Sequence, residues 1–180
     1  MKIKKYSVSI PLSGKVYDLA RKCQKVIYEG MSINSSYVND SVLHINLISG
    51  TTEKIDKIIS DIKKIKINKE NNHSKLIGLG VLLTPDPLIY LRFTNSVFLK
   101  DIRYFLFKKT ITFWDSLTDT VKDDLWIPKS TLAFKDFALT DLNKALVAVK
   151  DIELKLIMEI NQLSIIEFTD FENEIERINI

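Results

Sequence analysis

Two short polar pairs stand in otherwise apolar segments of this 180-residue sequence, and together they could perform chemistry. His44 and Asn46 lie within Ser-Val-Leu-His-Ile-Asn-Leu-Ile, and Lys129 and Thr131 lie within Trp-Ile-Pro-Lys-Ser-Thr-Leu-Ala. Residues two apart on a strand point to the same side, so each pair shares one face. If the two strands lie near each other, an imidazole, an amide, an ammonium and a hydroxyl converge. Such a set suits a phosphodiester, because the cation attracts its charge and the donors bind its non-bridging oxygens.

Periodic hydrophobic patterns predict the elements that must position these pairs. Strands are expected at 6–12, 41–48, 76–83, 88–93, 126–134, 154–160 and 164–168. Helices are expected at 14–30, from Thr51 through Ile62, around 97–108, and from Thr140 onward. Segment 69–75, which contains His73, is expected to be a solvated polar loop. Strand, helix, strand and helix follow one another in each half of the chain, so the two polar pairs occupy similar positions in a loose internal repeat.

Several side-chain placements follow from the same periodicities. The alternation in 41–48 puts Val42, His44, Asn46 and Ile48 on one face. The inward residues of the third helix are expected to be Phe98, Ile102, Phe105 and Leu106, and those of the fourth helix Leu142, Leu146 and Val149, with Thr140 as the N-cap of the fourth. A lysine face on the second helix is interpreted as a solvated surface rather than a dedicated binding patch; it consists of Lys54, Lys57, Lys63, Lys64 and Lys66.

The surroundings of both pairs resemble the two motifs of the two-histidine (2H) phosphoesterase superfamily, which includes 2'-5' RNA ligase-like proteins and cyclic phosphodiesterases. That family carries His-x-Thr/Ser-x twice, with an apolar last residue, and its second motif often stands in Trp-x-Pro-His-x-Thr-Leu-Ala. Residues 126–133 match this context except at Lys129, where the family has histidine. Asn46 likewise replaces the hydroxyl residue of the first motif. The resemblance spans essentially the whole chain.

The resemblance implies a single α+β domain over residues 1–180, with two small antiparallel sheets related by pseudo-twofold symmetry, flanking helices and a cleft between the sheets. In intact members one histidine is the general base and the other the general acid, and no metal is needed. Carried across, His44 is a proton-transfer group and Thr131 a phosphate-binding hydroxyl. Lys129 and Asn46 occupy the remaining positions of the site with altered chemistry.

Lysine at the second motif weakens the case for efficient catalysis. Its ordinary pKa of about 10.4, against about 6.5 for histidine, makes it a fixed cation near neutral pH. Losing one acid–base partner costs roughly 10²- to 10⁴-fold in rate. A lysine still attracts a phosphodiester, and the Asn46 amide can donate to a phosphate oxygen. Binding is therefore expected to survive these replacements better than turnover.

Further candidates could contact a bound nucleotide. Tyr37, Tyr90, Arg92 and Trp126 are candidates for substrate binding, because aromatic rings and guanidinium groups stack on bases. Packing on the core is an equal alternative for Tyr90 and Arg92, and Trp126 could mark a strand start that packs on the core. Asp86 and Asp115 have no neighbours at metal-ligand spacing, and no glycine-rich phosphate loop, nucleophile elbow or dinucleotide fingerprint occurs, so neither a metal site nor a cofactor site is predicted.

Composition bounds the class of protein. A hydrophobic fraction of 46% supports one core, and a net charge of +3 is too small for broad nucleic-acid binding. The single cysteine, Cys23, excludes an intrachain disulfide and is expected to be buried. No long uninterrupted apolar run predicts a membrane span, so a soluble, reducing, cytoplasmic setting is expected. The oligomeric state is left open.

Three functions follow, in order of preference. The first is binding of a nucleotide or short oligonucleotide phosphodiester, cyclic or 2'-5'-linked, with weak or no turnover. The second is a working metal-independent phosphodiesterase in which His44 performs acid–base chemistry and Lys129 stabilises charge. The third is a protein-interaction role that uses the scaffold and not the polar pairs.

Overall fold

The computed structural model describes residues 4–33, 41–66, 70–83, 87–118, 126–134 and 137–180. Its elements in chain order are β1 (Lys5–Pro11), α1 (Gly14–Met31), β2 (His44–Thr51), α3 (Ile55–Ile62), β3 (His73–Leu82), β4 (Leu88–Phe93), α4 (Val97–Thr110), a 3₁₀ turn (Ile111–Phe113), β5 (Ser116–Leu117), β6 (Lys129–Phe134), a second 3₁₀ turn (Leu139–Asp141), α5 (Leu142–Val149), β7 (Leu156–Glu159), β8 (Gln162–Phe168) and β9 (Glu172–Asn179).

The strands form two antiparallel sheets, which confirms the predicted α+β fold. One sheet has the order β5-β2-β1-β8-β9 and the other β6-β4-β3-β7. Four strands of each sheet correspond, since β2 matches β6, β1 matches β4, β8 matches β3 and β9 matches β7. Helix α1 joins β1 to β2, and α4 lies in the equivalent connection from β4 to β6. The internal repeat predicted from the sequence is therefore a repeat of sheet topology.

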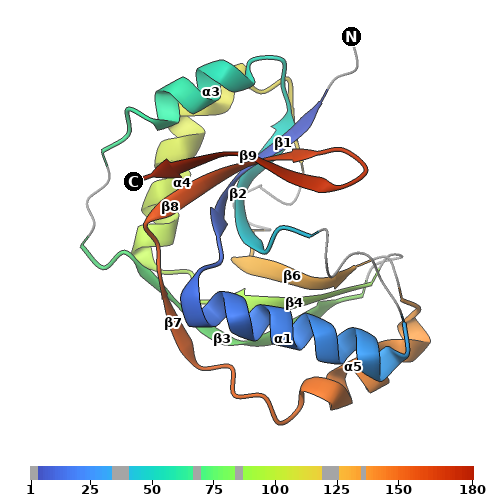
Figure 1. Ribbon diagram of the computed structural model, residues 1–180. Helices are drawn as coiled ribbons and strands as arrows, with labels where there is room; N and C mark the ends of the chain where they lie inside the picture. The colour runs from blue at the N-terminus through green and yellow to red at the C-terminus, as the bar shows by residue number, and fades with distance from the viewer. Residues whose placement is uncertain (1–3, 34–40, 67–69, 84–86, 119–125, 135–136) are drawn as a thin grey trace.

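Each connecting helix packs on the opposite sheet. Helix α1 leaves the five-stranded sheet and contacts β6, β7 and α5, whereas α4 leaves the four-stranded sheet and contacts β2 and α3. In Figure 1, α1 and α5 lie at the bottom of the view, α3 lies at the top, and α4 runs down the left side. One hydrophobic cluster joins both halves, with Ile45 of β2, Leu91 of β4 and Leu163 of β8 among its fully buried members.

Apolar spacing explains why α1 forms and where it lies. Val16, Ala20, Cys23 and Ile27 recur every three or four residues and are all buried, so they form one inward stripe. The helix ends at Ser32, whose left-handed backbone conformation stops further helical bonding. Burial raises the pKa of the Cys23 thiol to about 11, as expected of an inert core cysteine. None of the helices in the described part of the chain has the length and apolarity to cross a membrane.

The two motif strands contain a β-bulge at the same place. In β2, Val8 pairs with Ile48 but Ser9 pairs with Asn46, so Leu47 is the extra residue. In β6, Ile89 pairs with Ala133 but Tyr90 pairs with Thr131, so Leu132 is the extra residue. Both leucines hold the last position of the four-residue motif. A bulge changes the direction of a strand and of the side chains around it, and bulges are common beside active sites.

The bulge corrects one predicted face. Ile48 was expected to point to the same side as His44 and Asn46, but the extra residue moves it to the side of Ile45, where it is 1% exposed. A strict two-residue alternation does not hold across a bulge, and the sequence has no marker for this one.

Each bulge is bound by a buried side chain from the helix that crosses over. The carbonyl oxygen of Leu47 accepts a hydrogen bond from Arg103 Nε of α4 at 3.2 Å, and that of Leu132 accepts one from Gln24 Nε2 of α1 at 3.3 Å. Gln24 is 0% and Arg103 8% exposed. The two pairs are equivalent under the repeat, so each helix that packs on the opposite sheet supplies a buried donor to the carbonyl of a bulged residue.

Several other predictions were wrong in detail. His73 was assigned to a loop but begins β3, where it pairs with Glu159 of β7. Thr140 is not an N-cap, because it lies in a 3₁₀ turn and α5 begins at Leu142. Phe105 and Leu146, expected inward, are 49% and 36% exposed. Ala145 takes the inward position on α5 together with Val149.

Two strands were missed. β9 has the sequence Glu-Asn-Glu-Ile-Glu-Arg-Ile-Asn and forms the edge of its sheet, where polar residues tolerate exposure on one face. β5 has two residues and gives no periodic signal. Tertiary pairing alone defines both.

Gln24→Met is expected to lower the free energy of unfolding by about 1–3 kcal/mol, because it leaves the buried Leu132 carbonyl without its donor. Urea unfolding followed by circular dichroism measures this. The matched control is Lys22→Met on the exposed side of the same helix. Equal stability of the two variants would contradict the role assigned to Gln24.

Candidate functional site

Four of the predicted residues share one face of the four-stranded sheet. Lys129 pairs with Arg92 and Thr131 pairs with Tyr90 across the β4–β6 ladder. Residues directly opposite each other on antiparallel strands point to the same side of the sheet. Lys129 and Thr131 are half-buried, Arg92 is exposed and Tyr90 is 6% exposed. The structure therefore brings together two segments almost forty residues apart in the sequence.

A glycine fixes the tyrosine of this group. Gly80 of β3 pairs with Tyr90, and a β-carbon at Gly80 would overlap the tyrosine ring. The ring therefore lies over Gly80 and packs on the sheet, which accounts for its low exposure. Tyr90 forms a rigid wall beside Thr131 and has little free surface on which a base could stack.

Lys129 has an unusual environment for an ammonium group. Its side chain is half-buried and makes no hydrogen bond or ion pair with any described residue. Burial lowers the pKa of Lys129 below the ordinary lysine value, because desolvation disfavours the charged form. A desolvated cation without a partner is unfavourable for folding, and such groups concentrate at functional sites.

On β2, backbone geometry sets the orientation of the His44 imidazole. Its Nδ1 lies 2.6 Å from the carbonyl oxygen of Val42. A carbonyl can only accept, so Nδ1 carries the hydrogen and Nε2 holds the lone pair when the ring is neutral. The side chain is 12% exposed, and Nε2 has no hydrogen-bond partner among the described residues. Nε2 is thus the atom of His44 that can accept or deliver a proton.

Glu172 is a neighbour of His44 that the sequence did not indicate. Its Oε2 lies 4.0 Å from Nδ1 of His44 and accepts a hydrogen bond of 2.9 Å from the backbone N–H of Val42. The carboxylate therefore holds the strand start that orients the ring. Glu172 begins β9, and only the pairing of that missed strand places it near β2.

Asn46 occupies a polar row on the other sheet. Ser9 of β1 pairs with both Asn46 and Ser164, so the three residues lie side by side on one face. Ser9 donates to or accepts from Ser7 at 2.9 Å, and Ser164 donates to Glu174. The Asn46 Oδ1 atom is buried and has no hydrogen-bond partner among the described residues. This amide therefore has an unmet need for a donor such as water or a ligand.

The two motif strands meet where the sheets adjoin. β2 contacts β6, and Trp126 Nε1 donates a hydrogen bond of 2.9 Å to the carbonyl oxygen of Asn46. The Arg103 guanidinium lies 4.7 Å from the centre of the Trp126 ring. Trp126, predicted to bind substrate, thus links the backbone of the first motif to the segment that leads into the second. Tyr37 lies outside the described residues.

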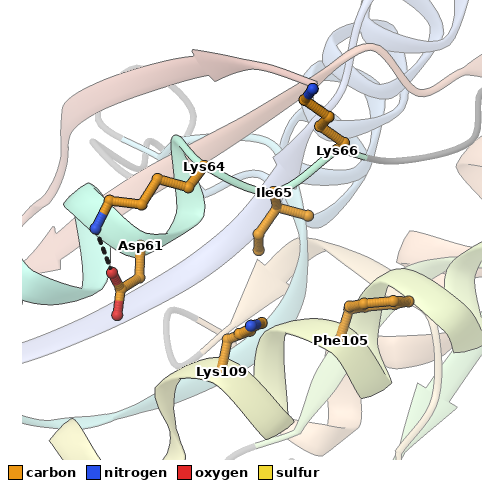
Figure 2. Close-up of a pocket in the computed structure, with 6 residues that line it drawn as sticks. All are labelled: Asp61, Lys64, Ile65, Lys66, Phe105 and Lys109. Carbon is orange, nitrogen blue, oxygen red and sulfur yellow. Dashed lines mark hydrogen bonds and ion pairs between the residues drawn. The ribbon is translucent and has the colours of Figure 1, made fainter.

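A separate hollow of about 230 Å³ lies between the end of α3 and α4. Figure 2 shows its lining, which consists of Asp61, Lys64, Ile65, Lys66, Phe105 and Lys109. The Lys64 ammonium donates to Asp61 at 2.8 Å. None of the predicted site residues lies here, and the lysines of α3 and its C-terminal extension are exposed, as expected of a solvated face. In the described part of the chain, no three His, Cys, Asp or Glu side chains gather in a way that could hold a metal ion.

Comparisons with known proteins give a limited result. No protein-family model and no curated protein matches this sequence. Among solved structures, Usb1 of Kluyveromyces marxianus is similar with a TM-score of 0.48 and 9% sequence identity, over 98% of this chain and 97% of that chain.

Lys129→Met is expected to raise the free energy of unfolding by about 1 kcal/mol at neutral pH, because it removes a desolvated charge and keeps the alkyl chain. The lowered pKa gives the sign of the pH dependence. The unfolded chain binds more protons between the folded and unfolded pKa values of Lys129, so the wild type gains stability as pH rises through that window. The advantage of the variant therefore shrinks toward alkaline pH.

Urea unfolding at neutral and alkaline pH measures both effects. Lys75→Met, at an exposed position on β3, is the matched control and is expected to leave stability unchanged. A Lys129→Met variant less stable than the wild type would contradict this description of the Lys129 environment.

Proposed function

We propose that this protein binds the phosphodiester of a nucleotide or short oligonucleotide, cyclic or 2'-5'-linked, between the faces that carry His44 and Lys129, with weak or no turnover. The observation that carries the proposal is the half-buried Lys129 ammonium, which has no partner among the described residues and lies on one face with Thr131 and Arg92. A phosphodiester supplies the missing counter-charge, and the neighbouring hydroxyl and guanidinium donate to its oxygens.

The matched bulges support treating the two motifs as equivalent halves of one site. Leu47 and Leu132 are extra residues at the same motif position, and each is bound by a buried side chain from the crossing helix. This symmetry agrees with the resemblance of both segments to 2H phosphoesterase motifs. The contact between β2 and β6 further supports a shared site. On this basis Asn46 and His44 contact the ligand from the opposite side to Lys129 and Thr131.

Chemistry at the lysine position favours binding over turnover. A lysine that acts as a general base must be neutral, but a bound phosphodiester stabilises the Lys129 ammonium and opposes the effect of burial on its pKa. Lys129 therefore stays charged when the ligand is bound and serves as an anion-binding group. Of the four motif residues, His44 is then the one whose side chain is suited to proton transfer.

A second candidate is slow phosphodiester cleavage by His44 alone. The Nδ1 contact with the Val42 carbonyl leaves the Nε2 lone pair for proton abstraction, which favours this alternative. Lys129 would then stabilise charge on the phosphate rather than act as the second acid–base group.

Calorimetric titration with 2',3'-cyclic nucleotides, 2'-5'-linked oligoadenylates and cyclic dinucleotides tests binding. At least one class is expected to bind, and Lys129→Met is expected to weaken its affinity by about tenfold or more, because a charge-assisted hydrogen bond is lost.

Wild-type affinity should fall as pH rises through the Lys129 pKa, which lies below the ordinary lysine value. Lys129→Arg should hold affinity over that range, since arginine stays charged.

Lys75→Met controls for the loss of a lysine that lies outside the site and is expected to bind like the wild type. Absence of heat with all three ligand classes would contradict the proposal.

Restoring the missing histidine tests catalysis. Lys129→His is expected to raise phosphodiester cleavage by about 10²-fold or more over the wild type, because it supplies the second acid–base group, and His44→Ala is expected to abolish that gain. Product release from labelled 2',3'-cyclic and 2'-5'-linked substrates measures this. If Lys129→His binds these ligands but releases no product, the two motif positions do not form a two-histidine catalytic arrangement.

A further inference from the structure

A second hollow, of about 300 Å³, lies on the exposed side of α4 next to the junction of the motif strands. It is lined by Asn95, Lys100, Arg103, Tyr104, Phe107 and Trp126. Four of these residues lie on α4 at positions 100, 103, 104 and 107, which form one stripe along a helix. Tyr104 is 64% and Phe107 40% exposed, so this face of the helix presents aromatic rings to solvent.

The wall of this hollow is preorganised by Trp126. The indole N–H is bound to the carbonyl oxygen of Asn46 at 2.9 Å, and the Arg103 guanidinium lies 4.7 Å from the ring centre. Arg103 is itself bound through Nε to the Leu47 carbonyl at 3.2 Å. A ring held from two sides loses little conformational freedom when a ligand binds against it.

The polar groups of the hollow suit an anionic ligand with a flat ring. Lys100 is exposed and makes no ion pair or hydrogen bond with a described residue through its side chain. Asn95 is also exposed, and its amide offers a donor and an acceptor side by side. Aromatic side chains stack on nucleobases, an amide can pair with a base edge, and an ammonium binds phosphate.

We propose that this hollow binds a nucleobase, with its phosphate toward Lys100. The base stacks against the aromatic rings of Tyr104, Phe107 and Trp126. Its volume lies at the lower end of the range of ligand pockets, roughly 300–1,000 Å³, as expected for a single nucleotide unit.

The hollow extends the phosphodiester site, and this step rests on the proposed function. Trp126 lines the hollow and binds the backbone of Asn46, so the two regions adjoin through one indole ring. A single-stranded oligonucleotide held at Lys129 and His44 can place a neighbouring base in the hollow. The ligand is therefore an oligonucleotide with a base outside the reactive linkage, and longer ligands should bind more tightly than a lone cyclic mononucleotide.

Titration of indole fluorescence with AMP and UMP tests the hollow separately from the motif site. The host protein is the His44→Ala/Lys129→Met double variant, in which the motif site is disabled. Nucleotides are expected to quench the signal, and Tyr104→Ala or Phe107→Ala added to this host should weaken binding by about tenfold. Phe105→Ala is the matched control, because Phe105 is equally an exposed aromatic of α4 but lines the hollow of Figure 2.

The outcomes separate the two proposals. Quenching that depends on Tyr104 but not on Phe105 supports the base site, even if the wild type binds no phosphodiester and the proposed function fails. Absence of quenching, equal loss in Phe105→Ala, or a response to an acidic peptide but not to nucleotides would overturn the base site. None of these results alters the calorimetric test of Lys129 with cyclic ligands.

Discussion

Two buried hydrogen bonds hold the backbone at the points where the motif strands bulge, and the arrangement of the candidate site depends on them. Arg103 binds the Leu47 carbonyl and Gln24 binds the Leu132 carbonyl. Both donors come from helices that start from the opposite sheet, so they also fix the position of one half against the other. Without a donor, a bulged carbonyl in the core costs the desolvation of a peptide group. Each connecting helix therefore packs on the opposite sheet and also binds the bulged strand of that sheet.

The polar groups on the inner faces differ in how fully they are satisfied. The serines beside Asn46 bond among themselves or to Glu174, whereas the Asn46 Oδ1 atom and the Lys129 ammonium have no partner in the described part of the chain. Buried polar atoms normally find partners, and exceptions reduce stability. Asn46 and Lys129 fall at corresponding strands of the repeat, one at the hydroxyl position of its motif and one at the histidine position. The buried Ser130 Oγ, on the other face of β6, also has no partner among the described residues. A ligand with both donors and negative charge satisfies Asn46 and Lys129.

Trp126 connects these local features to the surface of α4. Its indole N–H donates a hydrogen bond to the Asn46 carbonyl, and the Arg103 guanidinium lies over its ring. The same ring lines a hollow with Tyr104 and Phe107. The same residue therefore holds the strand junction and shapes a surface for recognition. Arg103 takes part in both the bulge contact and the indole contact, so one side chain touches both the first motif and the hollow.

The sequence by itself determined which segments alternate in period two, where α1 and α4 lie, and which two polar pairs interrupt apolar strands. These are local properties, because side-chain periodicity and turn residues act over a few positions. Only the tertiary structure decided the bulges at Leu47 and Leu132, the edge strand that brings Glu172 to His44, and the pairing of Lys129 with Arg92. Strand register and the packing of each connecting helix on the opposite sheet depend on contacts between residues far apart in the chain, and no local pattern encodes which partner a strand will find.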